Sequence, residues 1–323
     1  MGVRLDKHNY SISFLRMVSM VFIVLCHFCR YYGSEFEWWF NVGVQVFFCI
    51  SGFLYGSKKI DDPIGFITKN FKKILVPYFV FLIPTIVAYF IFARGSIGIM
   101  DTVGALLCCD TIDGIGHLWF VGYILLCYLA TPYLYWLFKK MEERGFGYVL
   151  SVFIALLVVA QGISLVLDSY FEFGRMAPYF VGYFLAFIIR KYSEKTFKIL
   201  SALIFIGAIC TVGIRIYMRY FVGFKASWFG YFEQYSHVLL GVTIFLLGYI
   251  LLKNMKGNKI MSLSDKYSYY VYIVHQLLIL SPFSLMAITS NVYLNWGITL
   301  VAIVVMSVVL KFLSDKVTNI ISK

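Results

Sequence analysis

Charged residues are scarce in this chain, and it has no long polar stretch in which a separate soluble domain would fold. Only 14% of the 323 residues are charged, whereas 61% are hydrophobic. No soluble domain of this length has such a composition. The chain also lacks an internal repeat and a phosphate-binding loop. We therefore predict a single integral membrane domain over residues 1–323.

The seven cysteines do not form the pattern of a secreted disulfide framework. They are scattered, and most lie in apolar segments, where a free thiol behaves as a small hydrophobic group. Cys26, His27 and Cys29 resemble a ligand set, but the helical turn of ~100° per residue places His27 off the line of the two cysteines. No second His/Cys pair completes a tetrahedral set. We predict no metal site and no bound cofactor.

Apolar runs long enough to cross ~30 Å of hydrocarbon recur along the chain. The first run is not a cleavable signal, because Arg16 interrupts it and no small-residue cleavage site follows. We predict an all-α, polytopic membrane bundle of about ten transmembrane helices and no fused extracytoplasmic domain. The ten predicted segments are roughly 12–32, 39–57, 74–93, 117–138, 146–167, 174–190, 197–220, 235–252, 267–284 and 293–313.

The loops between these segments alternate in charge. Loops of one set are poor in Lys and Arg and carry Glu35, Glu37, Asp101, Asp110, Asp113, Asp168 and Glu172. The other set holds 21 of the 28 basic residues, in Arg4–Lys7, Lys58–Lys73, Lys139–Arg144, Arg190–Lys198, Lys253–Lys266 and Lys311–Lys323. The positive-inside rule places this second set and both termini in the cytoplasm.

The net charge of +12 is thus mainly a signal of topology. Nucleic-acid binding is a poor interpretation, because the basic residues are spread over short loops. The segment 63–73 is amphipathic, and we expect it to lie along the cytoplasmic interface and to end where Pro77 starts the third span. Its residues Lys69, Lys72 and Lys73 would attract anionic lipid headgroups or an anionic substrate.

Two ionisable groups share one face of the first apolar segment. His27 follows Arg16 by eleven positions, which brings the two side chains within ~20° of each other around the helix and ~16 Å apart along it. Such groups are costly in hydrocarbon and by default face an interior site. Arg16 alone would equally be a residue that snorkels to the headgroups. Neutral His27 suits the removal of a proton from a hydroxyl near neutral pH.

Further polar residues lie in later segments. Tyr272 and His275 form a polar cluster near mid-membrane, which predicts the wall of a substrate site. His117 opens the fourth segment at the outer surface, where histidine is either a substrate contact or a residue of the interfacial belt. Ser51, followed by Gly52, indicates either a substrate contact or close helix packing.

Five blocks of the sequence resemble a known family, the acyltransferase 3 family of bacterial O-acyltransferases that decorate cell-surface glycans. FLRMVSMVFIVLCH resembles its first-span motif, in which ten residues separate Arg16 from His27. Lysines replace the arginines that are common in the family's basic block, and lysine offers no planar bidentate fork to phosphate. The blocks are FLRMVSMVFIVLCH (14–27), VFFCISGFL (46–54), FITKNFKKILVPY (66–78), HLWFVGYILLCY (117–128) and SYYVYIVHQ (268–276).

The resemblance implies a membrane-bound O-acyltransferase of the bacterial cytoplasmic membrane. Its donor would be cytoplasmic acyl-CoA, with acetyl-CoA as the default co-substrate, and its acceptor a cell-surface or lipid-linked glycan. Arg16, aided by Lys69, Lys72 and Lys73, would hold the anionic end of CoA.

His27 would take the proton of the sugar hydroxyl as the hydroxyl attacks the thioester, either directly or through an acyl-His27 intermediate. Three candidates could stabilise the oxyanion: the region around Ser51, the side chain of Tyr272, or that of His275.

Two rival functions exist for a polytopic protein with buried polar residues. A non-enzymatic glycan-lipid flippase or small-solute transporter would also place such residues near the midplane. However, the sequence has no paired Gly- or Pro-broken helices in matching halves. A polysaccharide polymerase would need a large outer loop rich in Arg, and the longest outer loops here have only roughly 20 residues.

Overall fold

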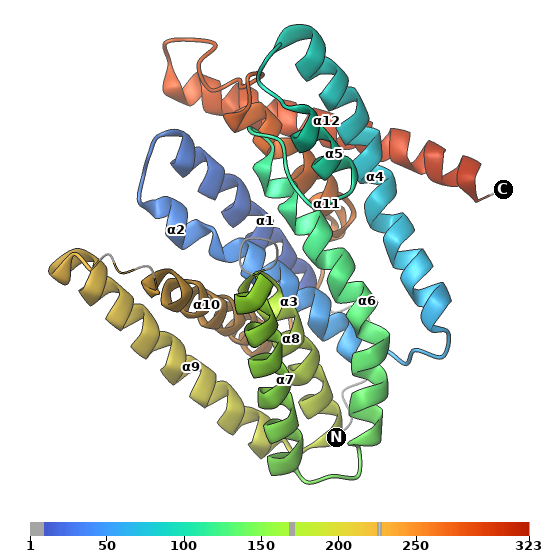
Figure 1. The fold of residues 1–323 in the computed structure, drawn as a ribbon, viewed down its shortest axis with the longest axis vertical. Coiled ribbons are helices and arrows are strands. Elements are labelled where there is room, and N and C mark those ends of the chain that lie inside the picture. Colours follow the sequence, from blue (N-terminus) through green and yellow to red (C-terminus); the bar gives the residue numbers. More distant parts are fainter. Residues whose placement is uncertain (1–9, 168–171, 225, 227, 323) are drawn as a thin grey trace. The chain divides into compact units, whose positions relative to one another are not determined.

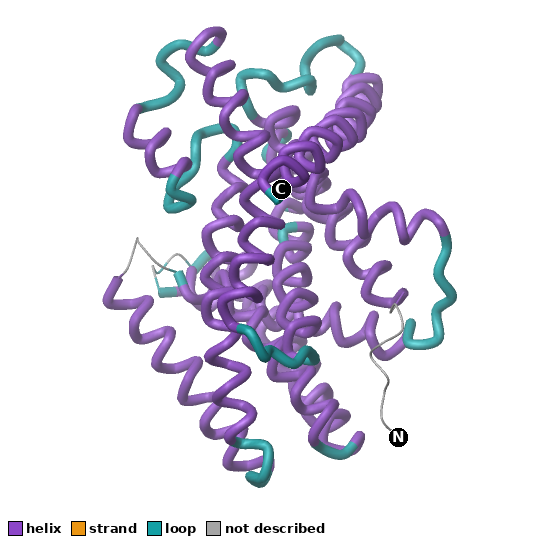
Figure 2. Tube along the Cα trace, turned by 90° about the vertical axis from the view of Figure 1, so that its right-hand side faces the viewer, coloured by secondary structure: helices purple, strands orange, loops and turns teal. Residues whose placement is uncertain are grey.

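The computed structural model describes residues 10–167, 172–224, 226 and 228–322. These residues form helices and loops, with no strand among them (Figures 1 and 2). The predicted all-α class is therefore confirmed. The helices are α1 (Tyr10–Tyr31), α2 (Phe36–Phe40), α3 (Val42–Gly56), α4 (Pro63–Phe92), α5 (Ile99–Leu106), the 3-10 turn η1 (Gly116–Leu118), α6 (Trp119–Lys140), α7 (Phe146–Leu167), α8 (Phe173–Lys191), α9 (Glu194–Ile216), the π-helical turn η3 (Tyr217–Val222), α10 (Phe229–Leu251), α11 (Lys259–Leu280) and α12 (Val292–Ile321).

Each of the ten predicted segments coincides with a long helix. Within the described residues, eight helical segments are long and apolar enough to cross a membrane, so the chain is a multi-pass membrane protein. The other two helices are α8, whose side chains are mostly buried, and α11, which carries charged residues in its first turns. The count of ten and the cytoplasmic termini remain predictions. Four residues of the charge pattern lie outside the described residues: Arg4, Lys7, Asp168 and Lys323.

One expectation about the third span is wrong. The amphipathic segment 63–73 was predicted to end at Pro77, but α4 continues through Pro77 and Pro84 to Phe92. Proline removes one backbone hydrogen bond from a helix interior. Membrane-spanning helices tolerate this loss because neighbouring helices and local adjustments satisfy the freed carbonyl.

The chain divides into two compact units. Unit 1 comprises Met1–Ser19, Val42–Asp61 and Ala130–Asn258, and unit 2 comprises Met20–Asn41, Asp62–Leu129 and Lys259–Lys323. Helices α1 and α6 each contribute residues to both units.

In unit 1, α3 and α8 pack backbone against backbone. A side chain at Gly52 would place its Cβ 1.9 Å from the Tyr179 carbonyl oxygen, and one at Gly182 would place it 2.2 Å from the Cys49 carbonyl oxygen. Only residues without a side chain permit such an approach. Of the two interpretations of the Ser51–Gly52 pair, close helix packing is therefore correct for Gly52.

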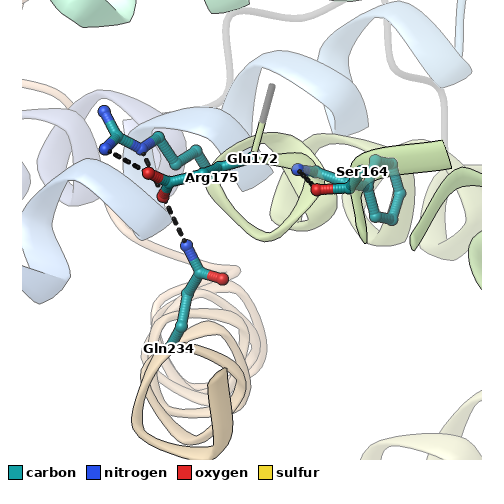
Figure 3. Close-up of polar contacts among 5 residues, drawn as sticks. Ser164, Glu172, Arg175 and Gln234 are labelled. Atoms are coloured by element: carbon teal, nitrogen blue, oxygen red, sulfur yellow. Dashed lines mark hydrogen bonds and ion pairs between the residues drawn. The ribbon is translucent and has the colours of Figure 1, made fainter. Parts of the chain in front are cut away.

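Polar contacts fix the start of α8 in the same unit (Figure 3). Both oxygens of Glu172 accept hydrogen bonds from Arg175, at 2.8 Å each, and one also accepts from the Gln234 amide of α10 at 3.1 Å. The backbone N–H of Phe173 donates to the Ser164 hydroxyl of α7 at 2.9 Å. These bonds join the start of α8 to two neighbouring helices.

In unit 2, tyrosine hydroxyls join α4 and α11 to distant segments. Tyr78 donates to the Ala105 carbonyl at 2.6 Å, Tyr89 to the Asp113 carbonyl at 2.9 Å, and Tyr269 to the Ile74 carbonyl at 3.0 Å. The first two bonds hold the segment between α4 and α6 against α4. The position of the η1 turn, which follows that segment directly, is set in this way.

Candidate active site

The predicted candidate base His27 lies on α1, a continuous helix that also carries Arg16. The His27 side chain is half-buried. Its Nδ1 atom is buried and has no hydrogen-bond partner among the described residues. The contacts of this imidazole within the described residues are therefore ring contacts, with no hydrogen bond at Nδ1.

His275 lies on α11 and is completely buried. Its Nδ1 is 2.7 Å from the Tyr272 carbonyl oxygen and 3.2 Å from the Val271 carbonyl oxygen. A carbonyl oxygen only accepts, so Nδ1 carries the proton in the neutral ring and Nε2 presents a lone pair. Nε2 is buried and meets no hydrogen-bond partner in the described part of the chain.

His117 lies in the η1 turn and is also buried, which excludes an interfacial-belt position for its side chain. Its Nε2 is 3.1 Å from the Ile273 carbonyl oxygen and therefore carries the proton of the neutral ring. The lone pair is then on Nδ1, which is buried without a partner within the described ranges.

The three imidazole rings converge in unit 2. Ring centroids are 4.9 Å apart for His27 and His275, 4.7 Å for His117 and His275, and 6.1 Å for His27 and His117. No group of three His, Cys, Asp or Glu side chains among the described residues has a geometry that would hold a metal ion. The cluster gathers the ring nitrogens of three imidazoles in one part of unit 2.

Helix α11 organises this cluster. Tyr272 and Gln276 are four residues apart and thus lie on one helix face, with His275 beside them. Gln276 Oε1 accepts a hydrogen bond from the backbone N–H of His117 at 2.9 Å, and the Tyr272 hydroxyl donates one to the His117 carbonyl oxygen. Both polar groups of the His117 backbone are therefore bonded to α11.

Sequence reasoning missed the role of Gln276. Its residue type and its place in the polar cluster were visible, but its partner is a backbone group 159 residues away in the chain. The four-residue spacing from Tyr272 is the signal that would have assigned both side chains to a single contact.

A glycine near the turn is required by its backbone. Gly114 has a φ of +79°, and a Cβ there would lie 2.7 Å from both the Tyr89 hydroxyl and the Ser281 Cα. Any other residue would be strained in this left-handed conformation and would clash with Tyr89 of α4 and with Ser281, the residue that follows α11. The sharp turn at Gly114 brings the chain to His117.

The candidate lysines are at the other end of α4. Lys69 and Lys73 are exposed, and Lys72 Nζ donates to the Ser322 hydroxyl at 2.7 Å. Sixteen residues separate Lys73 from Tyr89, a rise of roughly 24 Å along the helix. Ile74, the residue after Lys73, accepts the hydrogen bond of Tyr269 on α11, and His275 follows Tyr269 by six positions, a rise of roughly 9 Å along the helix.

Arg16 and Ser51 belong to unit 1, whereas His27, His117 and His275 belong to unit 2. The Ser51 hydroxyl donates to the Phe47 carbonyl oxygen at 3.0 Å, within its own helix.

All three candidates for stabilising the oxyanion thus have their protons engaged by backbone carbonyls. Ser51 donates to Phe47, Tyr272 donates to His117, and His275 donates from Nδ1 to Tyr272. An oxyanion needs a hydrogen-bond donor that is directed at it. None of these three groups offers one in this geometry.

A family model described as an acyltransferase domain, acyltransferase 3, matches residues 9–314. The chain belongs to the acyltransferase 3 family. The resemblance predicted from the five sequence blocks is confirmed by this match over nearly the whole chain, and three of the blocks carry the three histidines. No curated protein and no solved structure matches the chain. Acyltransferase 3 membership makes the histidine cluster the candidate active site.

Proposed function

We propose that this acyltransferase 3 protein transfers an acyl group, acetyl by default, from cytoplasmic acyl-CoA to a hydroxyl of a cell-surface or lipid-linked glycan. The convergence of His27, His117 and His275 supports this proposal. Three imidazoles whose ring centroids lie within 6.1 Å of one another are suited to accepting and returning a proton. The protein would act in the bacterial cytoplasmic membrane as a ten-span bundle with both termini in the cytoplasm.

In the proposed reaction, His27 is the general base. It takes the proton of the acceptor hydroxyl while the oxygen attacks the thioester carbonyl carbon. The carbon–sulfur bond then breaks, and His27 returns the proton to the departing thiolate of CoA. One acyl ester and one free thiol result. His117 and Tyr272 support the substrate site, with Tyr272 acting through the backbone of His117.

The donor site is proposed at the opposite end of the helices. Arg16 lies eleven residues before His27 on α1, and the lysines lie in the first half of α4. These cations would hold the phosphates of CoA at the cytoplasmic face. The thioester would extend from there toward His27, over the ~16 Å that eleven helical residues span. Membrane lipids with anionic headgroups would compete for the same lysines.

The test is acyl transfer in membranes that contain the protein. Membranes are incubated with labelled acetyl-CoA, and the glycan fraction is separated and counted. Wild-type protein is expected to label the glycan, and His27→Ala is expected to lower the rate by ~10²–10⁴-fold. Equal amounts of inserted protein are confirmed for both. A near wild-type rate for His27→Ala would disprove the role of His27, and absence of label with any acceptor would favour a flippase or transporter.

A further inference from the structure

The three imidazoles are not equivalent as hydrogen-bond partners. His117 and His275 each donate one ring N–H to a carbonyl oxygen of α11, so each presents only a lone pair on its other nitrogen. Two lone pairs cannot bond to each other. Within the cluster, only His27 is able to donate a hydrogen bond.

The buried nitrogens without partners indicate which nitrogen of His27 carries its proton. His27 Nδ1, His117 Nδ1 and His275 Nε2 are all buried and unpartnered within the described ranges. Buried polar atoms are almost always hydrogen-bonded, and each exception calls for an explanation. A proton on His27 Nδ1, directed to a neighbouring lone pair, would satisfy two of these atoms at once. His275 is the nearer acceptor, because its ring centroid is 4.9 Å from that of His27, compared with 6.1 Å for His117.

We infer that His275 is a positioning residue for His27: its Nε2 lone pair accepts a hydrogen bond from His27 Nδ1–H, which leaves the lone pair of His27 on Nε2. This inference rests on the proposed role of His27 as the base. Hydrogen bonds of this kind are often long before substrate binds and shorten in the complex. Because His27 is half-buried while its Nδ1 is buried, its other nitrogen is the one left to meet the acceptor hydroxyl.

The inferred arrangement is a chain of three hydrogen bonds, of which the structure contains the one between His275 Nδ1 and the Tyr272 carbonyl. The Tyr272 carbonyl fixes the proton on His275 Nδ1, His275 Nε2 fixes the proton on His27 Nδ1, and His27 Nε2 receives the proton of the acceptor. A carboxylate performs the middle role in serine hydrolases, where loss of the correct histidine tautomer nearly abolishes activity. Here a neutral imidazole would do so, which avoids placing an unpaired anion in an apolar surrounding. When His27 becomes an imidazolium, its Nδ1–H retains an acceptor.

Two amide substitutions at position 275 distinguish the need for a hydrogen-bond acceptor from the need for a side chain of similar size. The oxygen of glutamine occupies the place of an imidazole Nε2, whereas that of asparagine reaches only the place of Nδ1. We therefore expect His275→Gln to retain transfer to the glycan, and both His275→Asn and His275→Leu to lower kcat by roughly 10- to 100-fold, the effect of one hydrogen bond to a charged group. The KM for acyl-CoA is expected to stay unchanged in all three variants.

Transfer to hydroxylamine serves as the matched control. Hydroxylamine attacks thioesters as a neutral nucleophile and does not require a general base. After subtraction of its reaction with free acetyl-CoA, measured in membranes without the protein, variants with an intact fold and donor site should form the acetyl hydroxamate at the wild-type rate. A variant that has lost both reactions is misfolded and is left out of the kinetic comparison. The ¹⁵N measurement described below then tests the inference. Equal loss of glycan transfer in His275→Gln and His275→Asn, with hydroxamate formation intact, would overturn the inference.

A spectroscopic measurement tests the tautomer without any activity. Solid-state NMR of protein with ¹⁵N-labelled histidine, in membranes at neutral pH, is expected to show His27 protonated at Nδ1 and unprotonated at Nε2, with this preference lost in His275→Leu. A proton on Nε2 of His27 in the wild-type protein would overturn the inference. If wild-type protein forms neither acylated glycan nor hydroxamate, the proposed function fails, while the NMR result still decides the tautomer.

Discussion

The Tyr272 hydroxyl of α11 donates a hydrogen bond to the backbone carbonyl oxygen of His117, 155 residues away in the chain. Together with the bond from the His117 N–H to Gln276, this fixes the two peptide units that flank the His117 Cα on one helix face. The orientation of the His117 ring therefore depends on α11 and not on the η1 turn alone. A three-residue turn has too few internal bonds to fix a side chain by itself.

Removal of the Tyr272 hydroxyl should impair catalysis more than stability. In Tyr272→Phe the His117 carbonyl loses the hydrogen bond that joins it to α11, and the ring is held less firmly beside His275. We expect kcat to fall by roughly 10-fold, because small displacements of catalytic groups are costly. The matched control is Tyr269→Phe, whose hydroxyl bonds to the Ile74 carbonyl of α4 instead. Similar kcat values for the two variants would contradict a special role for Tyr272.

Replacement of Gln276 should affect both the fold and the activity. In Gln276→Leu the backbone N–H of His117 would be buried without an acceptor, which costs ~1–3 kcal/mol of stability. Thermal unfolding in detergent should show a lower Tm than for wild type, and the remaining folded protein should transfer acyl groups more slowly. Gln276→Glu keeps an acceptor oxygen at the same place and should restore much of the Tm. A Tm for Gln276→Leu equal to that of wild type would show that this bond contributes nothing.

Substitution of Arg16 should change use of the donor. We expect Arg16→Ala to raise the KM for acetyl-CoA while the protein still inserts, because an arginine–phosphate interaction is lost. Arg16→Lys keeps the charge without the bidentate fork and should give an intermediate KM. Kinetics in membranes at several acetyl-CoA concentrations measure this effect. An unchanged KM in Arg16→Ala would return Arg16 to the role of a residue that snorkels to the headgroups.

Much of the local structure was predictable from the sequence, because hydrophobic periodicity and length define membrane helices without reference to tertiary contacts. The Arg16–His27 spacing on one helix and the polar cluster at Tyr272 and His275 follow from such local rules. The burial of His117 against α11 does not. It depends on backbone bonds between segments more than 150 residues apart, and no periodicity within either segment encodes that pairing.

The chemical roles of several residues also required the structure. The type of Ser51 made it a candidate donor, but its proton is used within α3. A serine hydroxyl in a helix can always reach the backbone carbonyl four residues earlier, as Ser51 reaches that of Phe47. Only the surrounding contacts decide whether the hydroxyl bonds there. For Pro77, the local rule predicts a helix start, whereas the packing of α4 in unit 2 keeps the helix continuous.

The close approach of α3 and α8 gives a prediction about stability. Gly52→Ala places a methyl group 1.9 Å from the Tyr179 carbonyl oxygen, so the two backbones must separate. Overpacking of this kind costs ~1–3 kcal/mol. The matched control is Gly162→Ala in α7, where a Cβ meets no atom within 4 Å and alanine favours the helix. Thermal unfolding should show a lower Tm for Gly52→Ala only, and equal Tm values would contradict the close packing.

Glu172 gives a prediction about pH, because hydrogen bonds from Arg175 hold the pKa of this carboxyl below its ordinary value of 4.5. A depressed pKa in the folded state means that the ionised carboxylate stabilises the fold above pH 4.5, and that this contribution is lost as pH falls below that value. Glu172→Gln should therefore lower the free energy of unfolding at neutral pH by the small amount expected of a half-exposed ion pair, ~0.5–1 kcal/mol, and lower the Tm accordingly.

The difference in Tm between wild type and Glu172→Gln should then narrow as the pH is lowered from 7 toward 3, since protonated Glu172 and glutamine are both uncharged. Arg175→Gln removes the arginine of the same ion pair and leaves the carboxylate. Its difference in Tm from wild type should narrow over the same pH range, because both variants lack the ion pair at the start of α8. The two series are measured by thermal unfolding in detergent at constant ionic strength. A difference that stays constant down to pH 3 would show that the Glu172 charge does not stabilise the junction of α8 and α10.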